Sequence, residues 1–155
     1  MSAVLLTACS PAQTPDAPQP KTYAISGAEM GTLEEDVYKI LGKPDSYEVN
    51  TLTDWAFAHY DGLSIAFRAG GMRLVSPKVV DGFTATSPNH CLNKDICPRA
   101  TLRTVRERLG PAEIEPAKDG SKELYYILEG LEACWLNIYT EDEKTVSKVR
   151  LACQP

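Results

Sequence analysis

The sequence predicts an α+β protein built from two tandem repeats, each combining one helix with a three-to-four-stranded antiparallel sheet. Three observations predict it: a repeated segment, matching helix boundaries and matching hairpin turns. Residues 32–44 are echoed by residues 101–111, which keep Thr-Leu, Val, Leu-Gly and Pro in the same order. Gly42 and Gly110 mark the equivalent point in each copy, and self-similarity of this kind indicates one supersecondary unit written twice.

Each repeat is expected to begin with a short amphipathic helix. Thr32 followed by Glu35 matches a capping box, and Thr101 holds the same place in the second copy. Gly42 and Gly110 supply the glycine that commonly ends a helix. Apolar residues recur at helical spacing between these limits: Leu33, Val37, Ile40 and Leu41, then Leu102, Val105 and Leu109. Both helices are therefore expected to cover one face of a sheet.

Strands are expected after each helix. Residues 55–60 and 63–67 flank Asp61-Gly62, which is a two-residue hairpin signal. In the second repeat, residues 124–128 and 131–139 flank Glu129-Gly130 in the same way. A further strand is expected near 72–80 and another near 145–153. The predicted repeats then span residues 22–86 and 87–155.

The N-terminal residues resemble a bacterial lipoprotein signal. Leu6-Thr7-Ala8-Cys9 follows a short apolar run and matches a lipobox, although the basic start typical of an export signal is missing. The resemblance implies that residues 1–8 are a signal remnant and that Cys9 is lipidated. Ser10 resembles the sorting pattern for the outer membrane of a Gram-negative cell, which implies a protein facing the periplasm. The alternative is that Cys9 is an ordinary thiol near a chain end.

Residues 9–21 are interpreted as a tether. Four prolines lie among small and polar residues, a composition that favours extended conformers and cannot bury a core. At about 3.1 Å per residue, this segment reaches roughly 35–40 Å from a bilayer. Since no later stretch has 18 apolar residues, contact with a membrane is expected through the N-terminal lipid only.

The charge distribution argues against a nucleic-acid partner. The chain has 16 Lys and Arg against 21 Asp and Glu, a net charge of −5, and these charges are scattered. A phosphate backbone is normally met by a basic stripe, which this sequence lacks. The expected partner is therefore another protein.

Cysteine usage indicates an oxidising compartment. With Cys9 assigned to lipid, Cys91, Cys97, Cys134 and Cys153 form an even set, for which three connectivities are possible. Strand parity favours Cys134 with Cys153, leaving Cys91 with Cys97. His90 beside Cys91 raises the possibility of a metal, but a metal site needs about four ligands and only one other histidine exists. We expect no metal and no cofactor.

Catalytic signatures are absent from the sequence. No Gly-x-Ser-x-Gly elbow, phosphate-binding Gly-rich loop or His-Glu-x-x-His pair occurs. We therefore expect a protein that is not an enzyme, with a periplasmic enzyme of unrecognised site as the alternative.

Val-x-x-x-Leu-Gly-x-Pro, at Val37 to Pro44, after a capped helix start and before a strand meander resembles a known superfamily. It is shared by the outer-membrane assembly lipoprotein BamE (SmpA/OmlA type) and the β-lactamase inhibitor protein BLIP. The resemblance implies a protein that binds proteins through one concave face rich in aromatic residues. It also implies that Asp61 lies near the hairpin where such inhibitors insert an acidic residue into an enzyme.

Trp55, Phe57 and His59 share one face of a predicted strand whose other face offers small residues. A helix packs closely on small residues, so the Trp55 face is expected to look outward and to bind a partner, joined by Tyr125. The alternative places Trp55 and Phe57 in the core. The preferred function is an inhibitor or immunity lipoprotein that neutralises a toxic or lytic enzyme. The alternative is a BamE-like accessory in envelope assembly.

Overall fold

The computed structural model describes residue 20 and residues 22–53, 55–69 and 78–154. The predicted signal remnant, Cys9 and all of the tether except Pro20 lie outside the described residues. Among the described residues, no helix is long and apolar enough to cross a membrane.

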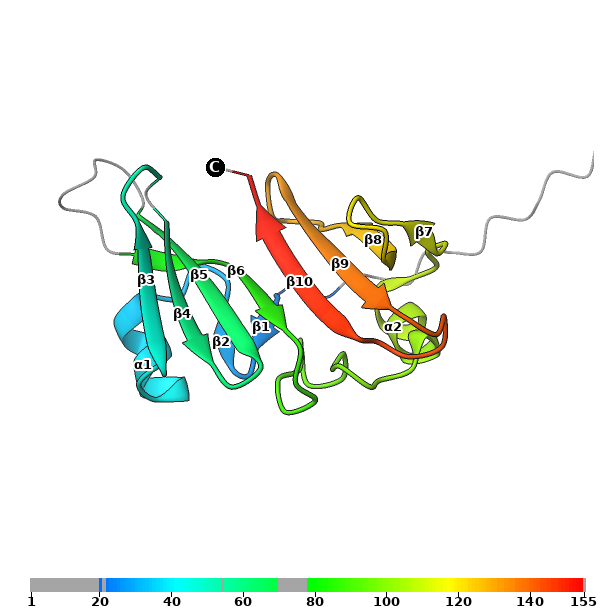
Figure 1. The fold of residues 1–155 in the computed structure, drawn as a ribbon, viewed down its shortest axis with the longest axis horizontal. Coiled ribbons are helices and arrows are strands. Elements are labelled where there is room, and N and C mark those ends of the chain that lie inside the picture. Colours follow the sequence, from blue (N-terminus) through cyan, green and yellow to red (C-terminus); the bar gives the residue numbers. More distant parts are fainter. Residues whose placement is uncertain (1–19, 21, 54, 70–77, 155) are drawn as a thin grey trace, which may run out of the picture.

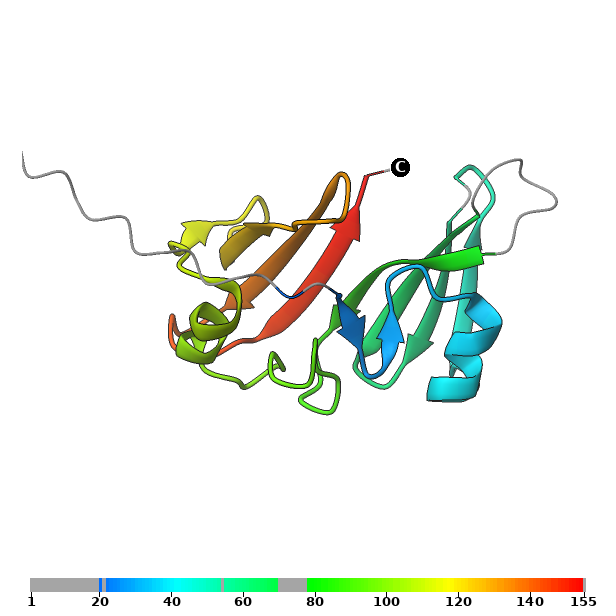
Figure 2. The same ribbon diagram turned by 180° about the vertical axis from the view of Figure 1, so that it is seen from behind.

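The chain forms one eight-stranded antiparallel sheet with two short helices (Figure 1). The strands, in sheet order, are β3 Ser46–Asn50, β4 Trp55–Tyr60, β5 Leu63–Ala69, β6 Lys78–Ala85, β10 Lys148–Cys153, β9 Cys134–Thr140, β8 Lys122–Ile127 and β7 Glu115–Pro116. A separate two-stranded hairpin consists of β1 Ala24–Ile25 and β2 Ala28–Glu29. Helices α1 (Glu34–Leu41) and α2 (Leu102–Leu109) and this hairpin all lie on the same side of the large sheet (Figure 2).

The predicted fold class is wrong. The protein has one continuous, mostly β architecture instead of two α+β repeats, because β6 pairs with β5 on one side and β10 on the other. Phe83, for example, lies opposite Ile65 on β5 and Leu151 on β10. Two separate sheets would each leave an unpaired edge at this point, and the β6–β10 ladder removes both edges. The division at residues 86 and 87 stays a prediction.

Gly82 lies in β6, paired with Ala66 on β5 and Ala152 on β10. A Cβ at this position would lie 2.7 Å from the backbone oxygen of Leu151, closer than real Cβ atoms come. The absence of a side chain therefore permits the β6–β10 pairing that joins the sheet.

The two helix starts differ. Thr101 caps α2 as expected, because its Oγ1 accepts a hydrogen bond from the Thr104 amide at 3.2 Å. The predicted capping box at Thr32 and Glu35 is wrong: Leu33 occupies the cap position of α1, and no side chain caps that helix. Three acidic residues in the first turn of α1 stabilise its start through the helix dipole instead.

The two predicted hairpin turns also differ. Asp61-Gly62 is the two-residue turn between β4 and β5, because Tyr60 and Leu63 are directly paired. Glu129-Gly130 is not such a turn, since β8 ends at Ile127 and β9 begins only at Cys134. The connection there is longer, and a bond from the Leu128 amide to the Cys134 carbonyl at 3.4 Å continues the ladder.

The core lies between the sheet and the helix side. Val37 of α1 and Leu102, Val105 and Leu109 of α2 are buried against apolar side chains from the facing surface of the sheet. Two disulfides, Cys91–Cys97 and Cys134–Cys153, confirm the prediction of disulfide bonds, with the pairing that strand parity favours. Cys134 and Cys153 are directly opposed on β9 and β10.

Candidate functional site

The face of the sheet opposite the helices carries no secondary-structure element of its own among the described residues (Figures 1 and 2). On β4, Ala56 and Ala58 have no exposed surface, while Trp55 and Phe57 on the other face are half-buried. We call this second surface the open face. It is defined by Trp55, Phe57, Tyr125, Trp135, Asn137 and Arg150.

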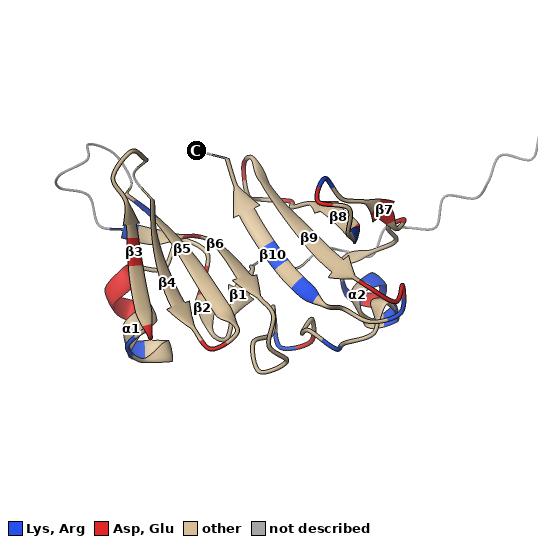
Figure 3. Ribbon diagram, in the orientation of Figure 1, with Lys and Arg blue, Asp and Glu red and all other residues tan. Residues whose placement is uncertain are grey.

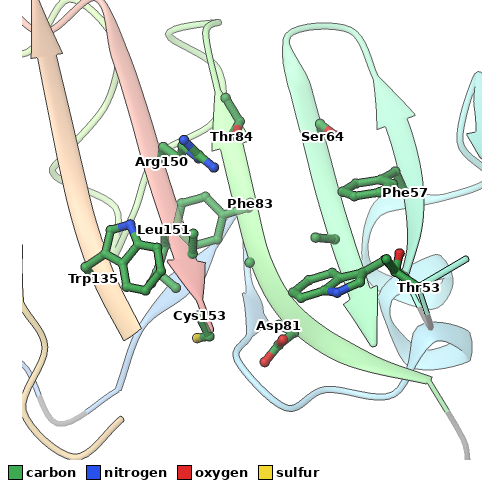
Figure 4. Close-up of a pocket in the computed structure, with 14 residues that line it drawn as sticks. Thr53, Phe57, Ser64, Asp81, Phe83, Thr84, Trp135, Arg150, Leu151 and Cys153 are labelled. Carbon is green, nitrogen blue, oxygen red and sulfur yellow. The ribbon is translucent and has the colours of Figure 1, made fainter. Parts of the chain in front are cut away.

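A hollow of about 330 Å³ occupies the middle of the open face (Figure 4). Trp55 and Phe57 line it from β4, and Trp135 lines it from β9 on the opposite side. The lining also includes Gly82 of β6, between the two aromatic sides. The two halves of the sheet therefore contribute aromatic walls to one depression.

The wall at β4 is held in place by packing and by charge. The rings of Trp55 and Phe57 stack with centroids 6.3 Å apart and planes inclined by 13°. The Arg68 guanidinium lies 5.7 Å from the Trp55 ring centroid, within the range of a cation–π contact. Arg68 also donates to the backbone oxygen of Gln154 at 3.0 Å. These contacts order a tryptophan that remains partly exposed.

Asp81 anchors Arg68 from the adjoining strand. It occupies the register shift between β5 and β6, and its Oδ2 lies 3.0 Å from Arg68 Nε, within ion-pair distance but without hydrogen-bond alignment. Burial raises the pKa of the Asp81 carboxyl, and the positive charge of Arg68 partly offsets that rise. The pair thus helps to hold Arg68 beside Trp55.

A second hollow of about 760 Å³ adjoins the first over β8 and β9. Tyr125 is 46% exposed and Ile127 is 73% exposed along its rim, while Trp135 and Arg150 line both hollows. The Nζ of Lys148 lies 3.8 Å from the centroid of the Tyr139 ring. The open face is therefore continuous from β4 to β8.

The sequence-predicted aromatic residues lie on this face at two separate places. Trp55, Phe57 and His59 are together on β4, and Tyr125 is on β8. Four strands separate β4 from β8, so the two groups stand about 24 Å apart along the sheet. His59 Nε2 lies 3.7 Å from Glu48 Oε2 and has no hydrogen-bond partner among the described residues.

Asp61 lies apart from this cluster, exposed in the β4–β5 turn. Its backbone oxygen accepts a 3.0 Å hydrogen bond from His90 Nε2, and His90 Nδ1 lies 2.9 Å from Ser26 Oγ. His90 thus ties the β1–β2 turn to the β4–β5 turn. In the described part of the chain, no group of three or more His, Cys, Asp or Glu is arranged to hold a metal ion.

Three residues of the open face were missed as site residues: Trp135, Asn137 and Arg150. The alternation of residues along β9 could have identified two of them, because Trp135 and Asn137 alternate with buried Leu136 and Ile138. The signal was ambiguous in the sequence, since both faces of this strand carry apolar side chains.

Comparisons with known proteins identify no family. No family model and no curated protein matches the chain. The structure is similar to the crystal structure of a DUF4309 family protein (YjgB) from Bacillus subtilis, with 13% sequence identity, 79% of each chain covered and a TM-score of 0.44.

Proposed function

We propose that this protein is a periplasm-facing outer-membrane lipoprotein that binds another protein through the open face. In this proposal it acts as an inhibitor or immunity protein and neutralises a toxic or lytic enzyme. Lipidation at Cys9 anchors it, and the proline-rich tether lets the sheet reach its target.

The observation that carries the proposal is the set of partly exposed aromatic side chains on the open face. Trp55, Phe57 and Trp135 surround one hollow, and Tyr125 lies on the rim of the next. Aromatic side chains in such depressions dominate the binding energy of many protein interfaces. The two disulfides suit an exported protein, because disulfides persist in oxidising compartments.

The charge of the open face supports an acidic partner. Lys148 and Arg150 place two cations in the middle of the open face, visible as the blue segments of β10 in Figure 3. Arg150 is exposed and makes no hydrogen bond or ion pair with any described residue. A protein that presents a convex, acidic element would complement this centre, because opposite potentials across an interface favour association.

The test is affinity capture from envelope extracts with the lipid-free protein and its variants. Trp55→Ala and Tyr125→Ala are expected to lose at least tenfold in capture, and His59→Ala is expected to lose less. Val49→Ala is the matched control, since Val49 is 56% exposed but lies on the opposite face of the sheet. Thermal unfolding of each variant separates loss of binding from loss of fold.

The identity of the captured protein decides the role. An enzyme whose activity falls on addition of an equimolar amount of this protein supports inhibition or immunity. A gene for a phospholipase, an amidase or another effector beside this one supports the same role. Barrel-assembly subunits in the capture contradict it and favour the envelope-assembly role.

A further inference from the structure

We infer that Arg150 and Asn137 form a subsite for the free carboxyl end of a peptide chain. The inference rests on the proposed function in one respect: the protein partner supplies this chain end. The subsite lies in the second hollow, beside the wall formed by Trp135.

Arg150 supplies the cation. In the described part of the chain, the open face holds two arginines, and Arg68 is already engaged by Asp81, by the Gln154 carbonyl and by Trp55. Arg150 has no such partner among the described residues and stays exposed. A guanidinium binds a carboxylate through two parallel hydrogen bonds, which makes Arg the usual receptor for this group.

Asn137 supplies a buried hydrogen-bond acceptor. Its side chain is 6% exposed, and its Nδ2 donates to Glu123 Oε2 at 2.7 Å. That bond fixes the amide orientation, because the flipped amide would place Oδ1 against a carboxylate. Oδ1 is buried and has no hydrogen-bond partner among the described residues. Leaving a buried acceptor without a donor costs free energy, so an N–H or O–H donated to Oδ1 by a ligand would favour binding.

The register places the two groups side by side. Asn137 on β9 is directly opposite Arg150 on β10, and the β-carbons of directly opposed residues lie about 4.5–5.5 Å apart. A ligand that carries a carboxylate with an N–H donor one carbon away can satisfy both. Every peptide chain ends in this pair of groups, and capture of a terminal carboxylate is a known mode of peptide recognition.

The hollow provides room and apolar surface for the last residues of the peptide. Its volume of about 760 Å³ lies within the range of small-ligand pockets, about 300–1,000 Å³. Trp135 and Tyr125 line it, so an apolar terminal side chain is expected. Glu123 on β8 lies on the other side of Asn137 from Arg150 on β10, so its negative charge disfavours an acidic terminal side chain while the chain-end carboxylate lies at Arg150.

The test is calorimetric titration of the purified protein with three synthetic peptides. The first is acetyl-Gly-Gly-Leu with a free carboxylate, the second is its C-terminal amide, and the third is acetyl-Gly-Asp-Gly amide, which carries an internal acid. We expect the first peptide to bind at least tenfold more tightly than either of the others. Equal binding of the amide, or of the internal acid, would overturn the assignment.

Variants test each residue separately. Arg150→Gln is expected to abolish the preference for the free acid, while Arg103→Gln, which removes an exposed cation of α2 on the other side of the sheet, keeps it within about twofold. An ester analogue in which the last amide N–H is replaced by oxygen is expected to bind wild type at least fivefold more weakly. The Asn137→Leu variant should bind the free-acid peptide and its ester analogue equally. Retention of either difference in the variant designed to remove it contradicts the inference.

The two proposals fail independently. Protein capture that needs Trp55 without any preference for the free acid overturns this inference and leaves the proposed function standing. A preference for the free acid together with capture that ignores the open face overturns the proposed function, and with it the protein partner as the source of the chain end, and leaves the carboxylate subsite standing.

Discussion

Phenylalanine side chains have different roles on the two faces of the sheet. Phe67 on β5 has no exposed surface and meets Tyr38 of α1 edge-on, with ring centroids 6.4 Å apart. Phe57, on the neighbouring strand, points to the other face and stacks on Trp55 at the edge of an open hollow. The covered face therefore contributes to folding, and the open face keeps apolar surface that folding does not bury.

The largest expected effect tests that contrast directly. Phe67→Ala should lower the free energy of unfolding by about 3–5 kcal/mol, because it removes a fully buried ring and leaves a cavity. Phe57→Ala should lower it by about 1 kcal/mol or less, since the ring is already partly in water. Urea denaturation of both variants measures the difference. Equal losses would mean that the open face belongs to the core.

The disulfides are expected to rank next. Cys134→Ala with Cys153→Ala should cost about 3 kcal/mol, because this bond closes a loop over a sequence separation of 19. Cys91→Ala with Cys97→Ala should cost about 2 kcal/mol, since the separation is only 6 and the entropy removed from the unfolded chain is smaller. Chemical denaturation under non-reducing conditions gives both values. The reverse ranking would show that the 91–97 loop contributes more than chain entropy.

Gly82→Ala tests the junction between the halves of the sheet. The added methyl group would meet the Leu151 carbonyl oxygen, so we expect a loss of about 1–3 kcal/mol from overpacking. Thr84→Ala, on the same strand and face, is the control and should lose less than about 1 kcal/mol. Hydrogen exchange of the β6 and β10 amides locates the damage. Unchanged protection there would contradict the close approach at this strand pair.

Local signals in the sequence predicted some individual elements correctly, and the fold class failed because long-range pairing was not predicted. Thr101 and the Asp61-Gly62 turn act within a few residues, so their patterns determine the α2 cap and the β4–β5 hairpin. The β6–β10 ladder joins segments about 65 residues apart, and no local pattern specifies it. The apparent repeat was misleading for the same reason, since similar helix signals do not decide which strands share a sheet.

The candidate site shows the same limit. Small residues at Ala56 and Ala58 predicted which face of β4 a helix covers, and the half-exposed Trp55 agrees with that reasoning. Trp135 offered no such contrast, because both faces of β9 are apolar. The sequence did not predict Arg150 as a site residue, because its position beside Asn137 follows from the register of β9 and β10.

The smallest expected effect concerns the turn after β9, where charge rather than apolar burial stabilises the structure. Asp142 accepts hydrogen bonds from the Thr145 and Lys144 amides and from the Thr145 hydroxyl, which lowers its pKa from 3.8 to about 2. Because the folded pKa lies below the unfolded value, this stabilisation is complete above about pH 4 and is lost as pH falls to about 2. Asp142→Asn should therefore flatten the dependence of thermal stability on pH in that window. Asp119→Asn, at a second exposed aspartate with a lowered pKa, is expected to flatten this dependence less than Asp142→Asn. An unchanged slope in Asp142→Asn would assign the acid sensitivity elsewhere.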